Sequence, residues 1–93
     1  MKPELVIVAA KRTPLGGFLG SLSTMSAIDL AIASHQACIQ QAGIDNNLID
    51  EVIMGCVLSA GLGQAPARQT ALGAGLLPQT VASTLNKVCG SGM

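Results

Sequence analysis

Cys89 is the residue with the clearest potential for chemistry in this sequence. It lies in "NKVCGSGM", after an apolar segment and before Gly90 and Gly92. A thiol in the first turn of a helix would face free backbone N–H groups and the positive end of the helix dipole, which favour the thiolate over the thiol. The two glycines leave room for an acyl group with a long thioester tail, and their N–H groups can hold a developing oxyanion. This pattern predicts a nucleophilic cysteine; the alternative is a small buried residue in a tightly packed turn.

The first half of the chain predicts one strand and one long helix. Glu4 to Ala10 is a short, continuously apolar run, which is typical of a strand inside a sheet that is covered on both faces. "PLGGFLGSLS" then contains too many glycines for either regular element and predicts a loop. From Ser26 to Ala42, apolar residues recur at helical spacing, with Ser26 suited to cap the helix and Gly43 suited to end it.

The second half predicts two more strands with a short helix between them. "DEVIMGCVLS" is apolar over most of its length, and Pro66 opens a helix of small residues after a glycine-rich loop. Val81 to Val88 is a third extended segment, and "CGSGM" would open a further helix. The order strand, helix, strand, helix, strand predicts an α/β fold with a mostly parallel sheet. Such sheets place their chemistry at the carboxyl ends of the strands, where Cys89 lies.

Composition excludes several classes of partner and site. The 93 residues carry five basic and five acidic side chains, so there is no electrostatic footprint for nucleic acid or for an anionic membrane. "LVIVAA" is too short for a signal peptide core or a membrane span, which predicts a cytoplasmic protein with an unprocessed N-terminus. Cys38, Cys56 and Cys89 are odd in number and widely spaced, which argues against disulfides and against a metal site.

Four stretches together resemble the N-terminal part of a thiolase, an acetyl-CoA acetyltransferase. They are "VIVAAKRTPLGGFLGSL", "EVIMGCVLSAGLGQAPARQ", "LGAGL" and "NKVCGSGM", and the resemblance runs over the whole chain. It implies that Cys89 accepts the acyl group, in a Claisen condensation of two acetyl-CoA molecules or in the reverse cleavage of a 3-ketoacyl-CoA. Coenzyme A thioesters would be substrates, and no separate cofactor is implied.

The same resemblance implies that residues 1–93 are the first portion of a thiolase N-terminal domain. They would supply the first three strands of a layered α/β fold that is incomplete on its own. In thiolases a histidine that activates the nucleophile, a second cysteine and most of the coenzyme A pocket lie on later segments, which here would follow Met93. The remaining polypeptide is thus an expected partner, and the family suggests a homodimer or a tetramer.

Two other functions remain open at this point. A related condensing enzyme, of the ketoacyl synthase or hydroxymethylglutaryl-CoA synthase type, would also place a nucleophilic cysteine where a strand meets a helix, although "GLGQAPARQ" disfavours it. The second is an inactive fragment whose only role is to associate with other chains.

His35 lies in the apolar stripe of its helix, and this position predicts a packed side chain rather than a catalytic base. Arg12 and Arg68 are not assigned to the site.

Overall fold

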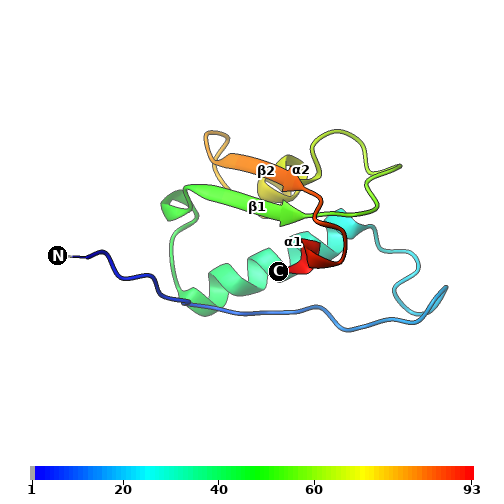
Figure 1. Ribbon diagram of the computed structural model, residues 1–93. Coiled ribbons are helices and arrows are strands. Elements are labelled where there is room, and N and C mark those ends of the chain that lie inside the picture. The colour runs from blue at the N-terminus through cyan, green and yellow to red at the C-terminus, as the bar shows by residue number, and fades with distance from the viewer. Residues whose placement is uncertain (1) are drawn as a thin grey trace.

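The computed structural model describes residues 2–93 and contains two α-helices, two parallel strands and two short 3-10 helices (Figure 1). In chain order they are α1 (Ala27–Ala42), η1 (Asn46–Leu48), β1 (Glu51–Gly55), α2 (Pro66–Gly73), β2 (Val81–Leu85) and η2 (Val88–Gly92). The alternation of strand and helix expected for the second half of the chain is therefore present, with the strands shorter than predicted.

The long helix α1 is capped at both ends, by Ser26 at its start and by Gly43 at its end. The Ser26 hydroxyl accepts a hydrogen bond from the Asp29 N–H at 3.0 Å, and the Asp29 carboxylate accepts one from the Ser26 N–H at 3.1 Å. This capping box satisfies backbone donors that the first turn leaves free. At the other end Gly43 adopts φ 66°, and its N–H donates to the carbonyl of Ile39 at 3.0 Å. The predicted helix over Ser26 to Ala42 is confirmed as α1.

The two strands pair in parallel through the β1-α2-β2 crossover. Glu51 lies opposite Val81, and the register continues to Gly55 opposite Leu85. One further bond, from the Cys56 N–H to the Leu85 carbonyl at 2.8 Å, closes the pairing at its carboxyl end. The predicted parallel arrangement is confirmed, and both strands end at the same edge of the sheet, as parallel strands must.

Small residues bring α2 against the sheet. Thr70 is fully buried, and its hydroxyl donates to the Met54 sulfur at 3.4 Å. The Ala67 N–H, one of the free donors at the start of α2, donates to the Thr84 hydroxyl at 2.9 Å. Both threonine hydroxyls have hydrogen-bond partners. α2 can therefore lie close to both strands without the free-energy cost of burying an unpaired hydroxyl. The buried core is formed by Val52, Ala71 and Leu76, with Ile39, Ile49 and Ala82 packed against it.

Gly73 allows α1 to pack against α2. A Cβ atom at this position would overlap the end of the Ile32 side chain and would lie 3.0 Å from its Cγ1. The last turn of α2 therefore has no room for a larger residue unless Ile32 moves.

The "GLGQAPARQ" segment is explained by the contacts of its polar side chains. The Gln69 amide donates to the carbonyls of Leu62 at 2.8 Å and Gln64 at 2.7 Å, which ties the glycine-rich loop to α2. The Arg68 guanidinium donates to the Pro78 carbonyl at 2.6 Å, which ties α2 to the turn that precedes β2. Both side chains hold loops in place, so the structure gives Arg68 a structural role.

The prediction of a strand inside a sheet at residues 4–10 is wrong. This segment is an extended chain that runs beside α1 (Figure 1), and within the described residues no strand pairs with it. The Ala10 N–H donates instead to the Gln41 side chain at 3.1 Å. Leu5 and Ile7 are 96% and 89% exposed. An apolar, β-branched run favours a strand, but a strand also requires a neighbour to accept its backbone hydrogen bonds, and residues 2–93 supply none there.

The described residues expose more surface than a complete domain of this size would. Their accessible surface is 7003 Å², whereas a compact folded protein of 9.3 kDa exposes about 5,000 Å². The radius of gyration is 14.0 Å, against about 12 Å for a compact domain of this length. The excess includes large apolar side chains such as Leu15 and Phe18, which are 87% and 96% exposed. The extended segment and its apolar side chains thus lack the cover that a complete core provides.

We expect residues 1–93 expressed alone to associate rather than to form a stable monomer. The reason is the small core and the unpaired backbone along the outer edges of β1, β2 and residues 4–10. Size-exclusion chromatography with amide hydrogen exchange measures this directly. A sharp monomer peak with strongly protected strands would contradict the expectation.

Candidate active site

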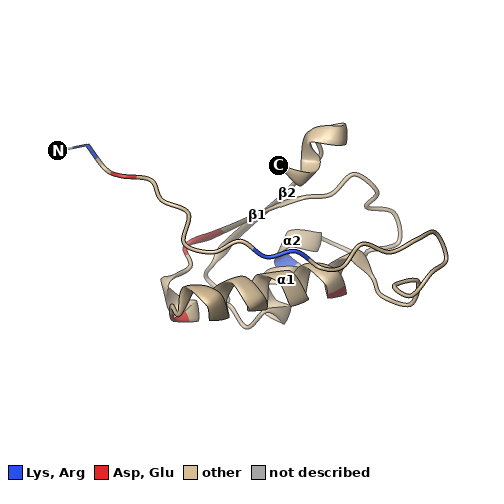
Figure 2. Cartoon of the chain, turned by 90° about the horizontal axis from the view of Figure 1, so that it is seen from below, with Lys and Arg blue, Asp and Glu red and all other residues tan. Residues whose placement is uncertain are grey.

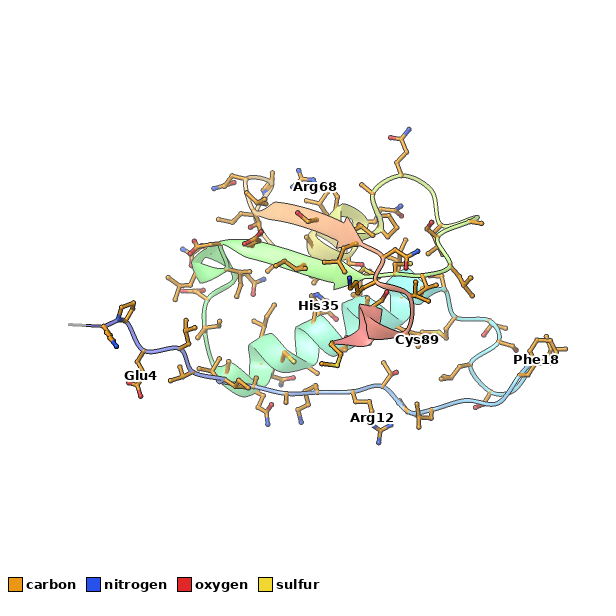
Figure 3. All side chains as sticks on the ribbon, viewed as in Figure 1. Glu4, Arg12, Phe18, His35, Arg68 and Cys89 are labelled. Carbon is orange, nitrogen blue, oxygen red and sulfur yellow. The ribbon has the colours of Figure 1, made fainter. Side chains whose placement is uncertain are left out.

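Cys89 is exposed on η2, at the carboxyl end of the two strands (Figure 3). The chain leaves β2 at Leu85 and returns over the end of β1, so that Cys89 is the second residue of η2. The predicted position at a strand-to-helix junction is confirmed. The element itself differs from the prediction, because the strand ends three residues before Val88 and the helix that holds Cys89 is a five-residue 3-10 helix.

The backbone of η2 lies directly on the last residue of β1. A Cβ atom at Gly55 would overlap the carbonyl oxygen of Ser91 and would lie 3.0 Å from the Ser91 Cα. The obstacle is backbone rather than a flexible side chain, so a side chain at position 55 would force η2 away from the sheet. Gly55 is therefore required for the observed position of Cys89, a role that the sequence pattern did not reveal.

The turn that presents Cys89 contains an unusual backbone conformation. Val88 has φ 49°, in the left-handed region that β-branched residues rarely adopt. Two side chains hold this residue. The side-chain Oδ1 of Asn86 accepts from the Val88 N–H at 2.8 Å. The Ser91 hydroxyl donates to the Val88 carbonyl at 2.8 Å and accepts from the Lys87 N–H at 2.8 Å. The sequence contains a signal of this turn. Asn86 and Ser91 lie within three residues of Cys89, and Asn and Ser side chains readily form hydrogen bonds to nearby backbone groups.

The other two cysteines lie in packed surroundings. Cys38 is half-buried on α1, and Cys56 is half-buried one residue after β1, rather than within the strand as predicted. Cys89 is thus the exposed member of the three. Since thiol reactions require access, this difference favours reaction at Cys89.

His35 is half-buried on α1, with its Nδ1 2.7 Å from the Ala31 carbonyl oxygen (Figure 3). It lines a hollow of about 670 Å³ between the N-terminal segment, α1 and β1, together with Cys38 and Ile53. Cys89 is not among the residues that line this hollow. Met93, which follows η2, does line it, but no contact between His35 and Cys89 is present among the described residues.

Charged groups are few and dispersed. Figure 2 shows the basic residues on separate parts of the chain, including the N-terminal segment and α2, with acidic residues between them. Within residues 2–93 no three His, Cys, Asp or Glu side chains come together as a metal site would require. Neither α1 nor α2 is long and apolar enough to cross a membrane.

Comparison with known proteins decides the family. A model of the thiolase N-terminal domain matches residues 5–93. The chain belongs to the thiolase family. It is 52% identical to acetyl-CoA acetyltransferase 2 of Arabidopsis thaliana over 90 residues, and 50% identical to a cytosolic acetyl-CoA acetyltransferase of Gibberella zeae over 91 residues. These alignments cover 97% and 98% of this chain, but only 22% and 23% of the two relatives.

A solved thiolase structure supports the fold. The structure of acetyl-CoA acetyltransferase from Syntrophomonas wolfei superposes with a TM-score of 0.89 at 39% identity, over 95% of this chain and 22% of that one. The α/β architecture implied by the resemblance is therefore confirmed. The exposed apolar segments belong to a chain that spans about a fifth of the length of its thiolase relatives.

We expect Cys89 to react with iodoacetamide before Cys38 and Cys56. Cys89 is exposed and the other two are half-buried, so brief treatment of the folded full-length protein should label Cys89 before Cys38 and Cys56. Peptide mass spectrometry gives the fraction modified at each site, and denatured protein, in which all three thiols are accessible, is the control. Faster modification of Cys38 or Cys56 in the folded protein would contradict this reading of the site.

We expect Gly55→Ala to destabilise the full-length protein by about 1–3 kcal/mol, which is the usual cost of overpacking a filled site. The added methyl group would meet the Ser91 carbonyl. Gly17→Ala is the matched control, because a Cβ there has no neighbour within 4 Å. Urea unfolding of both variants measures the difference. Equal stability of the two would show that the close contact at Gly55 is not a constraint.

Proposed function

We propose that this chain is the N-terminal part of an acetyl-CoA C-acetyltransferase in which Cys89 is the nucleophile. The observation that carries the proposal is the exposed position of Cys89 at the carboxyl end of the parallel strands, in a chain of the thiolase family. Its relatives with about half of their aligned residues identical are named acetyl-CoA acetyltransferases. A thiol can serve this reaction because it forms a thioester, which exchanges with the thioester of coenzyme A at little cost in bond energy.

The reaction proceeds in two steps, acylation of Cys89 and transfer of the acetyl group to a second acetyl-CoA. The Cys89 thiolate attacks the carbonyl carbon of acetyl-CoA, the bond from that carbon to the coenzyme A sulfur breaks, and coenzyme A leaves as a thiolate. A second acetyl-CoA then gives up a proton from its methyl carbon, which balances the proton that the departed coenzyme A thiolate takes up to become a thiol, and the resulting carbanion attacks the acetyl group on Cys89. The bond to the Cys89 sulfur breaks, which gives acetoacetyl-CoA and regenerates the thiolate. Cleavage of a 3-ketoacyl-CoA follows the same steps in reverse.

Residues 2–93 supply the nucleophile and its support, and we place the other groups elsewhere in the full-length enzyme. His35 lies on the hollow that Cys89 does not line, and Cys38 and Cys56 are half-buried, so none of them is assigned as acid or base. The proton transfers and most of the coenzyme A binding are thus assigned to segments outside this chain.

We further propose a homo-oligomer in the cytoplasm. The exposed apolar side chains, among them Leu15, Phe18 and Leu19, are consistent with faces that further segments or subunits cover.

The cytoplasmic assignment is supported by the relative of Gibberella zeae that is named cytosolic. Other relatives of similar identity are named mitochondrial, so fractionation of the source cells is the test of location.

We expect Cys89→Ser to lower acetyl transfer by the full-length enzyme by roughly three orders of magnitude or more, because a hydroxyl is a far weaker nucleophile than a thiolate. Fold and coenzyme A binding should persist, since the two side chains are nearly equal in size. Cys38→Ser is the matched control and should retain activity. Thiolysis of acetoacetyl-CoA, followed by loss of its absorbance, measures both variants; a Cys89→Ser enzyme near the wild-type rate would refute the proposal.

A further inference from the structure

We propose that Ser91 and Asn86 are positioning residues for Cys89: their side chains hold the turn that presents the thiol to the acyl carbonyl. This inference rests on the proposed function, in which Cys89 is the nucleophile. Neither side chain needs to touch the substrate for this role. Both act through the backbone on either side of Cys89.

The Ser91 hydroxyl closes a ring of contacts around Cys89. It accepts from the Lys87 N–H at 2.8 Å and donates to the Val88 carbonyl at 2.8 Å, so one hydroxyl links the residues before the cysteine to a residue after it. The Gly90 N–H donates to the Lys87 carbonyl at 2.9 Å and adds a backbone link across the same turn. Cys89 lies between the points that these bonds join, which limits the movement of its Cα.

Asn86 holds the unusual residue of the turn. Its side-chain oxygen accepts from the Val88 N–H at 2.8 Å. Val88 at φ 49° would relax toward an extended or helical conformation if nothing held it, because a β-branched side chain is unfavourable in the left-handed region. Such a relaxation would rotate the peptide that enters Cys89 and would redirect the thiol.

The ring is anchored to the sheet by the backbone of Ser91. The Ser91 carbonyl lies where Gly55 has no side chain, at the end of β1. The hydroxyl of the same residue then fixes Lys87 and Val88 relative to that anchor. A path of direct contacts thus runs from β1 through Ser91 to both sides of Cys89, and it fixes the nucleophile relative to the sheet.

Positioning of this kind affects the rate of acyl transfer more than substrate binding. A reacting pair must come within about 3–3.5 Å with aligned orbitals, and a displacement of about 1 Å can cost about a hundredfold in rate. We expect Ser91→Ala to lower kcat about tenfold or more and to change the KM for acetoacetyl-CoA less than about twofold, because the binding groups lie elsewhere. Ser91→Thr keeps the hydroxyl and should restore kcat to within about threefold of wild type.

The experiment compares Ser91→Ala, Ser91→Thr and Ser34→Ala in the full-length enzyme. Ser34 is the matched control, because its hydroxyl also donates to a backbone carbonyl, that of Ala31 at 3.0 Å, but on α1. For each variant, kcat and KM come from thiolysis of acetoacetyl-CoA, and the rate constant for alkylation of Cys89 comes from timed iodoacetamide labelling. We expect only Ser91→Ala to show lower kcat and altered Cys89 alkylation, with the melting temperature close to that of Ser34→Ala.

Two results would overturn the inference. One is a Ser91→Ala enzyme with kcat within twofold of wild type, and the other is a Ser91→Thr enzyme as impaired as Ser91→Ala. If Ser91→Ala does not fold, the pair Asn86→Ala and Asn86→Asp replaces it: the aspartate keeps an acceptor for the Val88 N–H, so it should exceed the alanine variant in kcat, and equal rates would refute the role. A wild-type enzyme without transferase activity would instead refute the proposed function, and the alkylation rates would still test the turn.

Discussion

The backbone contact between Gly55 and Ser91 joins the scaffold of this protein to its candidate nucleophile. β1 ends at a residue with no side chain, and η2 occupies the space that a side chain would fill. Parallel pairing with β2 brings the chain to this edge, since Gly55 and Leu85 are register partners and the turn to Cys89 follows Leu85 directly. The position of the thiol is thus a consequence of where two parallel strands end.

Behind the sheet, α2 holds the two strands in that arrangement. Its buried face is made of small residues, and its hydrogen bonds to Met54 and Thr84 reach both strands. The polar residues of "GLGQAPARQ" then tie the neighbouring loops to α2 through Gln69 and Arg68. Two stretches that mark this sequence as a thiolase therefore have different roles. "NKVCGSGM" carries the candidate nucleophile, and "GLGQAPARQ" stabilises the crossover between the two strands.

Local patterns of residue type and spacing predict much of the fold. The cap at Ser26, the left-handed Gly43 and the proline at the start of α2 act within one turn of the chain, so their effects follow from the sequence around them. The same holds for Cys89 at the end of an extended segment. Residues 4–10 differ, because their apolar pattern favours a strand but the neighbouring strand that must accept its hydrogen bonds would come from a distant part of a chain.

The sequence by itself determined α1, the parallel crossover, the family and the choice of Cys89 as the candidate nucleophile, because each depends on short-range spacing or on a contiguous motif. Only the tertiary structure decided that Gly55 must lack a side chain and that Cys89, rather than Cys38 or Cys56, is exposed. Both facts depend on contacts between residues far apart in the chain or on burial by other elements. No local pattern records such contacts, because they arise only when the elements pack.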